Sequence, residues 1–220
     1  MNRKNKPTYL KRIISDIIEI KRDPIDNIHI HYNEDNILEI KALIIGPQDT
    51  PYENGYYLFK LNFSEKYPYN PPKGLFETTN GIIRFNPNLY ENGYVCLSIL
   101  GTWAGPKWSP CQTLKSILLS LQTLLNEHPF RNEPSYEGLP DNHEDVVNYD
   151  RCIEYHNYSF AISEIMFNLK DYKCFSEIIN KHFLENYDKN LKRLYDLKNK
   201  YNGQDFNCRL FSTTSVKIRS

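Results

Sequence analysis

The feature that most limits the fold is a series of strand-like runs with no helix between them. Residues 27–31, 36–45 and 55–63 alternate apolar and polar side chains, and a shorter run follows at 74–78. A period of two residues is typical of strands that bury one face. Because only short turns separate the runs, the sequence predicts a four-stranded antiparallel meander.

Helices are expected before and after these strands, which makes the predicted fold class α+β. Residues 8–22 carry apolar side chains at helical spacing, and Asp23-Pro24 ends this helix because the residue before a proline avoids the helical region. Residues 142–169 and 174–199 are interpreted as two more helices.

A further helix is expected after the strands, starting near residue 109. Ser109 suits the N-cap, Pro110 the first helical position, and Gln112 the capping-box position three residues after the cap. Apolar residues from Leu114 onward then supply a buried stripe.

Length and charge limit the classes of protein. The chain has 220 residues, so we expect one core domain at 8–135, a helical extension packed on it at 136–199 and a loose tail at 200–220. With 27 basic and 27 acidic residues, the balanced charge argues against nucleic acid as a general partner. No apolar run is long enough for a membrane span, and the charged N-terminal stretch does not resemble a secretory signal.

The cysteines are odd in number and widely spaced. They stand at 96, 111, 152, 174 and 208, with no Cys-x-x-Cys pair. Neither a zinc site nor a disulfide framework is supported, so we expect no bound metal and reduced thiols in the cytoplasm or nucleus.

One cysteine lies in an unusual stretch, "NGYVCLSILGTWAGPKWSP" at 92–110, which has neither strand nor helix period. A turn at Glu91-Asn92-Gly93 folds the chain back, so Asn88 can approach the sulfur of Cys96. A thiol that forms a thioester needs hydrogen-bond donors for the oxyanion that develops, and a carboxamide is a suitable donor. The alternative is that Cys96 is an inert apolar residue and that Asn88 only caps a turn.

The order of motifs then carries a resemblance. The first helix, the meander, "TPYENGYYLFKLNF", "YPYNPP", "NPN", "NGYVCLSIL" and "WSP" together resemble the ubiquitin-conjugating (E2) family over residues 8–135. "CLSILGTWAGPKWSP" is similar to a subgroup of large E2s, which includes the E2 module of the giant inhibitor-of-apoptosis protein and the E2 charged by the second ubiquitin-activating enzyme.

The resemblance implies roles for particular residues. Cys96 would accept the ubiquitin C-terminus from an E1, and Asn88 would stabilise the oxyanion or hold the active-site loop. Asn86 stands where the family has a mostly structural histidine. Glu133 falls near the acidic residue that orients an incoming lysine, although a one-residue shift would put Asn132 there.

The resemblance also implies partners: ubiquitin or a ubiquitin-like modifier, an E1, an E3 ligase and a protein substrate. Tyr69 matches the first E3-docking loop, and Pro110 and Cys111 belong to the second. Lys11 and Arg12 resemble the basic face that E1 and E3 share. No cofactor is expected, because the E1 consumes the ATP.

Other interpretations remain open at this point. A non-catalytic E2-like scaffold would bind ubiquitin without a reactive thiol. A cysteine hydrolase would need a histidine beside the thiol, with His128, His143 and His156 as candidates. Cys111 is a rival thiol if it lies in the first turn of a helix, where amide dipoles lower a thiol pKa.

Overall fold

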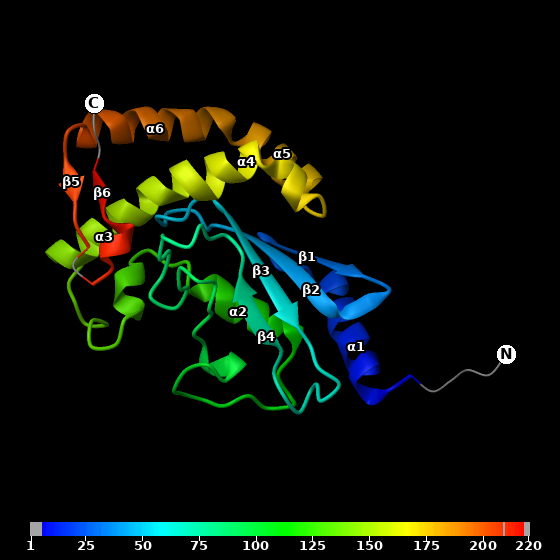
Figure 1. Ribbon diagram of the computed structural model, residues 1–220. Helices are drawn as coiled ribbons and strands as arrows, with labels where there is room; N and C mark the ends of the chain where they lie inside the picture. The colour runs from blue at the N-terminus through cyan, green and yellow to red at the C-terminus, as the bar shows by residue number, and fades with distance from the viewer. Residues whose placement is uncertain (1–5, 209, 218–220) are drawn as a thin grey trace.

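A four-stranded antiparallel sheet lies at the centre of the molecule (Figure 1). This computed structural model describes residues 6–208 and 210–217. The strands β1 (Ile28–Asn33), β2 (Asn36–Ile45), β3 (Tyr56–Asn62) and β4 (Lys73–Phe76) pair in chain order. The predicted meander is therefore confirmed.

Helical elements precede and follow the sheet, which confirms the α+β class. In chain order they are α1 (Thr8–Arg22), η1 (Ser98–Leu100), α2 (Leu114–Thr123), η2 (Pro129–Asn132), α3 (Glu144–His156), η3 (Asn157–Glu164), α4 (Ile165–Phe167), η4 (Leu169–Tyr172), α5 (Ser176–Glu185), α6 (Tyr187–Tyr201) and η5 (Ser212–Thr214). A small hairpin of β5 (Asp205–Phe206) and β6 (Val216–Lys217) completes the described chain.

Both faces of the sheet are buried, which is unusual for an antiparallel sheet. One face of β2, through Ala42 and Ile44, joins a core with α1, α2 and α3. The other face, through Leu43 and Ile45, joins a second core with η3, α4 and α5. Because successive strand residues point to opposite faces, the continuous apolar run at 42–45 serves both cores.

The later helices are more broken than the sequence indicated. The predicted helix 142–169 is α3 followed by a wider π-helical stretch, η3, and the short α4. The predicted helix 174–199 is two helices, α5 and α6, which are separated at Asn186.

The capping prediction for α2 was wrong by four residues. Thr113 is the N-cap, and its side chain and that of Ser116 form the reciprocal capping box. Gln112 does bond to Ser109, but this pair closes a turn ahead of the helix. Two overlapping cap patterns were present, and the later one is followed directly by the buried stripe.

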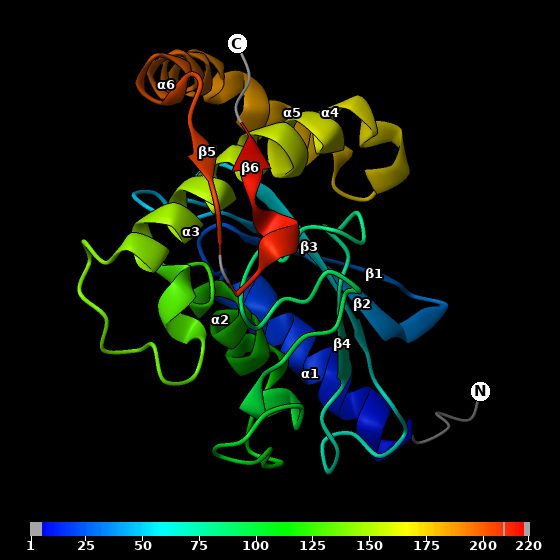
Figure 2. The ribbon, with the colours of Figure 1, turned by 60° about the vertical axis from the view of Figure 1, so that its left-hand side comes forward.

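The prediction of a loose tail at 200–220 was also wrong for the described residues. After α6 the chain returns along α3 as β5, η5 and β6 (Figure 2). Its buried residues are Tyr201, Phe206, Cys208, Phe211, Thr214 and Val216. These apolar side chains are separated by Asn, Gly, Ser and Thr, so the segment shows no single period.

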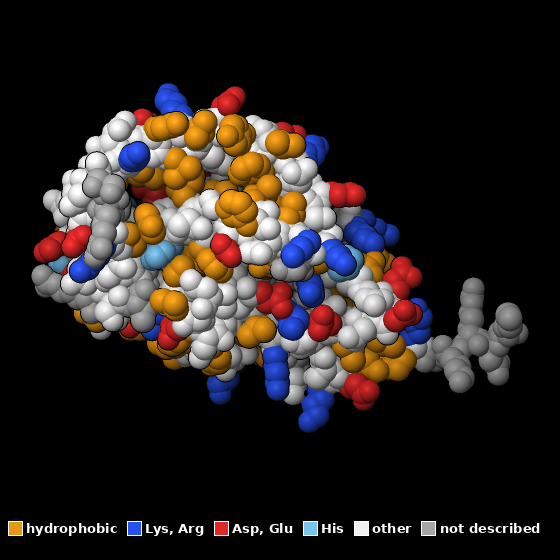
Figure 3. Space-filling view, turned by 45° about the horizontal axis from the view of Figure 1, so that its top comes forward, with side chains coloured by type: hydrophobic (Ala, Val, Ile, Leu, Met, Phe, Trp, Pro, Cys, Tyr) orange, Lys and Arg blue, Asp and Glu red, His pale blue; other side chains and the backbone are white. Residues whose placement is uncertain are grey.

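The C-terminal helices expose an apolar surface. Figure 3 shows hydrophobic side chains gathered on the face that these helices form. The exposed large side chains of this part include Phe167, Leu184, Tyr187, Leu194 and Tyr195. None of the helices within the described ranges is long and apolar enough to cross a membrane.

Candidate active site

Cys96 lies at the end of a short segment that pairs with its own upstream neighbours. The backbone N–H of Cys96 donates to the carbonyl of Asn88 at 2.8 Å, and Tyr90 N–H donates to the carbonyl of Tyr94 at 3.0 Å. Gly93 takes the left-handed conformation in the turn between them, with φ of 85°. The predicted reversal of the chain before Cys96 is therefore confirmed.

The thiol of Cys96 is covered by the loop that follows it. Cys96 is 4% exposed, and its Sγ donates to the carbonyl of Thr102 at 3.3 Å. The Thr102 hydroxyl donates to the Val95 carbonyl at 2.7 Å and accepts from Leu97 N–H at 2.9 Å. Cys96 lies beside the main core cluster and is not a member of it. Thr102 thus holds the loop after Cys96 against the thiol. This threonine was not singled out from the sequence.

The Asn88 side chain does lie beside Cys96. Its Nδ2 donates to the carbonyl oxygen of Cys96 at 2.7 Å. Together with the backbone bond in the other direction, this joins the two residues twice. The carboxamide thus holds the loop through one N–H, and its nitrogen carries a second N–H that can donate to a reacting group.

Asn86 is a buried structural hub. Its Nδ2 donates to the hydroxyl of Tyr52 at 3.0 Å and to the carbonyl of Leu124 at 2.7 Å, while its Oδ1 accepts from Asn88 N–H at 2.9 Å. The side chain is fully buried. Its partners explain why asparagine serves here: a carboxamide both donates and accepts without carrying charge.

Two charges act on the thiol from different elements. Burial raises the pKa of Cys96; the positive charge of Arg84 lowers it and the carboxylate of Glu133 raises it. Asn132, the alternative to Glu133, is held in the Asn86 network through bonds to Asn86 and Asn126. Glu133 carries a charge that acts on the Cys96 sulfur, whereas Asn132 is neutral.

Arg84 was not anticipated. Its Cζ lies 3.9 Å from the ring centre of Tyr90 and 4.4 Å from that of Phe211, and Nη2 donates to the carbonyl of Pro87 at 2.7 Å. A cation two residues before Asn86 was a visible signal in the sequence. Its contact with Phe211, far along the chain, was not.

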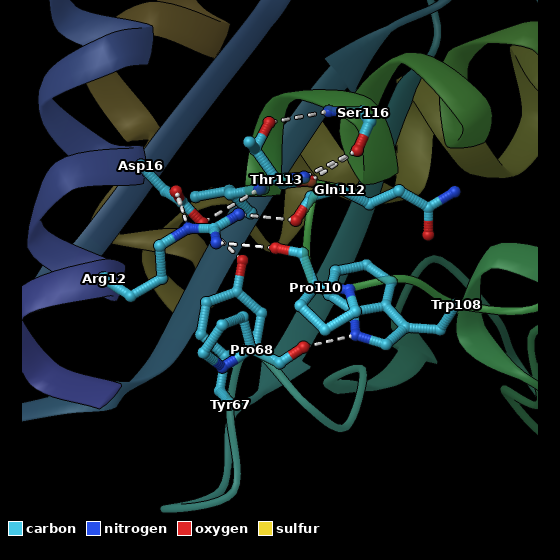
Figure 4. Close-up of polar contacts among 10 residues, drawn as sticks. Arg12, Asp16, Tyr67, Pro68, Trp108, Pro110, Gln112, Thr113 and Ser116 are labelled. Carbon is cyan, nitrogen blue, oxygen red and sulfur yellow. Dashed lines mark hydrogen bonds and ion pairs between the residues drawn. The ribbon is translucent and has the colours of Figure 1, made fainter. Parts of the chain in front are cut away.

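The two expected docking loops lie side by side (Figure 4). Trp108 Nε1 donates to the carbonyl of Pro68 at 2.6 Å, which joins the loop of Tyr69 to that of Pro110. Tyr69 is 73% exposed, and Pro110 and Cys111 are exposed as well.

Arg12 fixes the second of these loops to α1. Its Nη1 and Nη2 donate to the carbonyls of Pro110 at 2.7 Å and Gln112 at 2.6 Å, and its Nε donates to Asp16 at 2.8 Å. The expected basic face therefore does not hold for Arg12, whose guanidinium bonds within the chain. Lys11, its neighbour, is exposed. Asp16, the ion-pair partner of Arg12, is 2% exposed.

The remaining thiols show no comparable arrangement. Cys111 precedes α2 and does not lie in its first turn, so the helix-terminus argument for a rival thiol does not apply. Burial raises the pKa of Cys152 to about 12 and also raises that of Cys208. Cys174, half-buried, also has a raised pKa because of burial.

The three candidate histidines are engaged elsewhere. His128 pairs with Asp150 at 2.8 Å, His143 caps α3, and His156 lies 3.0 Å from the carbonyl of Thr214. Over the described ranges, the hydrogen bond from Sγ of Cys96 goes to Thr102 and to no histidine.

A reversed chain that positions one thiol beside an asparagine, on a helix-sheet-helix core, is the pattern of the E2 fold, and comparison with known proteins agrees. The profile described as "Ubiquitin-conjugating enzyme" matches residues 12–153, so the chain belongs to the ubiquitin-conjugating enzyme family.

Among its relatives, ubiquitin-conjugating enzyme E2 Z of Homo sapiens is 42% identical over 189 residues, covering 83% of this chain and 52% of that protein. The dual E2 ubiquitin-conjugating enzyme/E3 ubiquitin-protein ligase BIRC6 of Homo sapiens is 41% identical over 166 residues, 71% of this chain and 3% of that protein. These relatives confirm the similarity to large E2s. The chain spans about half the length of E2 Z. The solved structure of human ubiquitin-conjugating enzyme E2 G1 aligns with 54% of this chain and 95% of its own at 32% identity, with a TM-score of 0.48.

Proposed function

We propose that this chain is an E2 enzyme that carries ubiquitin, or a ubiquitin-like modifier, as a thioester on Cys96. The Cys96 thiolate attacks the modifier's C-terminal carbonyl on an E1 thioester, and the E1 thiolate leaves. A substrate lysine amine then attacks the new thioester. An amide forms, the Cys96 thiolate leaves, and the amine loses a proton.

The two hydrogen bonds that join Asn88 to Cys96 are the observation that carries this proposal. They hold the Asn88 carboxamide next to the backbone of Cys96, which supports a role as donor to the oxyanion that develops in both transfers. Glu133, the C-cap residue that follows η2, supplies a carboxylate toward which an incoming lysine ammonium is attracted. A thioester is already a good acyl donor, so positioning supplies most of the remaining catalysis.

Charging requires the loop over the thiol to shift. The Sγ bond to Thr102 must break before a modifier tail reaches the sulfur. The Thr102 hydroxyl anchors this cover through contacts with Val95 and Leu97, and each such hydrogen bond contributes only about 1 kcal/mol net, so the loop can open at a modest cost in free energy.

Partner surfaces follow from the paired loops. We propose that Tyr69, Pro110 and Cys111 form the E3-docking surface and that Lys11, beside it on α1, contributes to E1 contact. The E1 consumes the ATP, so the chain itself needs neither nucleotide nor metal. The five cysteines are free thiols, and we propose the cytoplasm or nucleus as the location of the chain.

A charging assay tests the proposal. The chain is mixed with a panel of E1 enzymes, ATP and either ubiquitin or other modifiers, and adducts are separated with and without reductant. We expect a reductant-sensitive adduct that Cys96→Ala abolishes, that Cys96→Ser converts to a reductant-resistant oxyester, and that the control Cys174→Ser leaves unchanged. Ubiquitin binding without any adduct would instead favour a scaffold, and E1-independent cleavage of a ubiquitin fusion would favour a hydrolase.

A further inference from the structure

The C-terminal segment, defined here as residues 205–208 and 210–217, reaches the strand-like stretch that leads to the site. Arg84 N–H donates to the hydroxyl oxygen of Thr214 at 3.2 Å, and that hydroxyl lies 3.3 Å from the Arg84 carbonyl. Tyr149 on α3 donates to the same carbonyl at 2.9 Å. Thr214 is fully buried. The backbone of Arg84 is therefore fixed from the far end of the chain.

The side chain of Arg84 is fixed by rings. Its Cζ lies 4.4 Å from the Phe211 ring centre and 3.9 Å from that of Tyr90. Its Nε is buried and has no hydrogen-bond partner among the described residues. Contacts with the two aromatic rings, which a planar guanidinium favours, therefore help to set its orientation.

Arg84 in turn holds both ends of the segment that supports Cys96. Nη2 bonds to the Pro87 carbonyl at 2.7 Å, and the guanidinium packs on Tyr90. Between these two residues stands Asn88, which is joined to Cys96 by two hydrogen bonds. A contiguous set of contacts therefore runs from Phe211 to Cys96.

We propose that Phe211 and Thr214 are positioning residues of the active site. They hold Arg84, and Arg84 in turn holds the segment that carries Asn88 beside Cys96. The C-terminal segment is then part of the catalytic machinery rather than an appendage to it. The expected effect on transfer to lysine rests on the proposed function. The expected effect on the pKa of the Cys96 thiol does not.

The charge of Arg84 makes this arrangement measurable. Two charged groups act on the sulfur: Arg84, from the stretch before Asn86, and Glu133, which follows η2. The guanidinium favours the thiolate and lowers the Cys96 pKa, while burial and Glu133 raise it. The Tyr149 hydroxyl and the Cys208 thiol also lie within the influence of Arg84. If Arg84 moves away, the Cys96 pKa rises further.

The test compares two matched substitutions in one segment. Phe211→Leu removes the ring over Arg84 but keeps an apolar side chain of similar size. Phe206→Leu is the control, because Phe206 is also buried and its ring lies 5.4 Å from a different guanidinium, that of Arg151. The rate of alkylation by iodoacetamide is followed against pH, and peptide mass spectrometry resolves Cys96 from Cys111, which serves as an internal reference.

We expect Phe211→Leu to slow Cys96 alkylation at pH 8 about threefold and to move its profile to higher pH, with Cys111 unchanged, since a neighbouring cation stabilises the thiolate. Phe211→Tyr, which keeps a ring, should restore the profile. In the charged enzyme, discharge to lysine should fall about tenfold with Phe211→Leu, since small misplacements of catalytic groups are costly. Phe206→Leu should leave both measurements near those of the parent chain.

Equal profiles for Phe211→Leu and Phe206→Leu would overturn the proposal. If Phe211→Leu does not fold, as judged by circular dichroism, Thr214→Val replaces it, with exposed Ser212→Ala as its control; the same shift is expected, and an unshifted profile refutes the inference. Alkylation uses no E1 and no modifier. Failure to charge at all therefore counts against the proposed function, whereas an unshifted thiol profile counts against the positioning role.

Discussion

The carboxamide of Asn88 donates to the carbonyl oxygen of Cys96 at 2.7 Å, and the Cys96 N–H donates back to the Asn88 carbonyl at 2.8 Å. The amide nitrogen carries two N–H groups, so the same side chain can hold the loop through one and donate to an oxyanion through the other. Loss of the loop contact lowers stability and loss of the oxyanion donor slows transfer, so separate measurements distinguish the two roles.

Replacement of Asn88 by alanine should slow transfer more than it lowers stability. We expect charging to be nearly intact, discharge to lysine to fall by about 10²–10³-fold, and the free energy of unfolding to drop by about 1 kcal/mol. Single-turnover discharge and urea denaturation measure these effects. Asn92→Ala is the control, since that side chain accepts a local bond from Tyr94 N–H. A normal discharge rate would leave Asn88 with a purely structural role.

Removal of the Glu133 charge should have opposite effects on the thiol and on transfer. Because the carboxylate raises the Cys96 pKa, Glu133→Gln lowers that pKa and increases the thiolate fraction near neutral pH. Alkylation should therefore become faster, while discharge to lysine becomes slower by about tenfold. Exposed Glu137→Gln is the matched control. If discharge is unaffected, Glu133 does not orient the lysine.

Release of the loop over Cys96 should make the thiol more accessible. Thr102→Val removes the hydroxyl that bonds to Val95 and Leu97, at a cost of about 1–2 kcal/mol in stability. We expect faster alkylation of Cys96 at every pH, by about threefold, since each hydrogen bond lost shifts such an opening equilibrium by a few-fold or more. Ser98→Ala in the same loop should change little. An unaltered rate would show that Thr102 does not limit access.

Neutralisation of Asp16 should loosen the paired docking loops. Asp16 accepts from Arg12 Nε at 2.8 Å, from Leu114 N–H at 3.2 Å and from the Tyr67 hydroxyl. Asp16→Asn should lower the free energy of unfolding by about 2–3 kcal/mol, because a buried ion pair loses one partner. Glu19→Gln, on the exposed side of α1, provides the comparison in urea denaturation.

In the Asp16→Asn variant, E3-stimulated discharge of the modifier should also fall, because the docking loops are loosened. Charging by the E1 should continue. If charging and E3-stimulated discharge decline together, the substitution acts through global stability and the loops have no separate dependence on Asp16.

The meander and α1 were predictable from the sequence because their signals are local. Alternating runs at 36–45 and 55–63 specify strands, and Asp23-Pro24 ends α1 at the expected residue. The pairing of Asn88 with Cys96 was also within reach, since a turn with Gly93 brings together residues that are close in the sequence.

Other features were decided only by tertiary structure. The sequence could not indicate that Arg12 and Asp16 face loop 110–114 or that Phe211 packs on Arg84, because these contacts join residues far apart in the chain. The cover of Thr102 over the thiol depends on one loop conformation that no periodicity encodes. Local sequence thus determined which segments form strands and helices and where the reactive thiol stands. Packing between distant segments determined the pKa of that thiol, the loop that covers it and the contacts that hold it. The reason is that burial and electrostatic fields come from whichever groups the fold brings together.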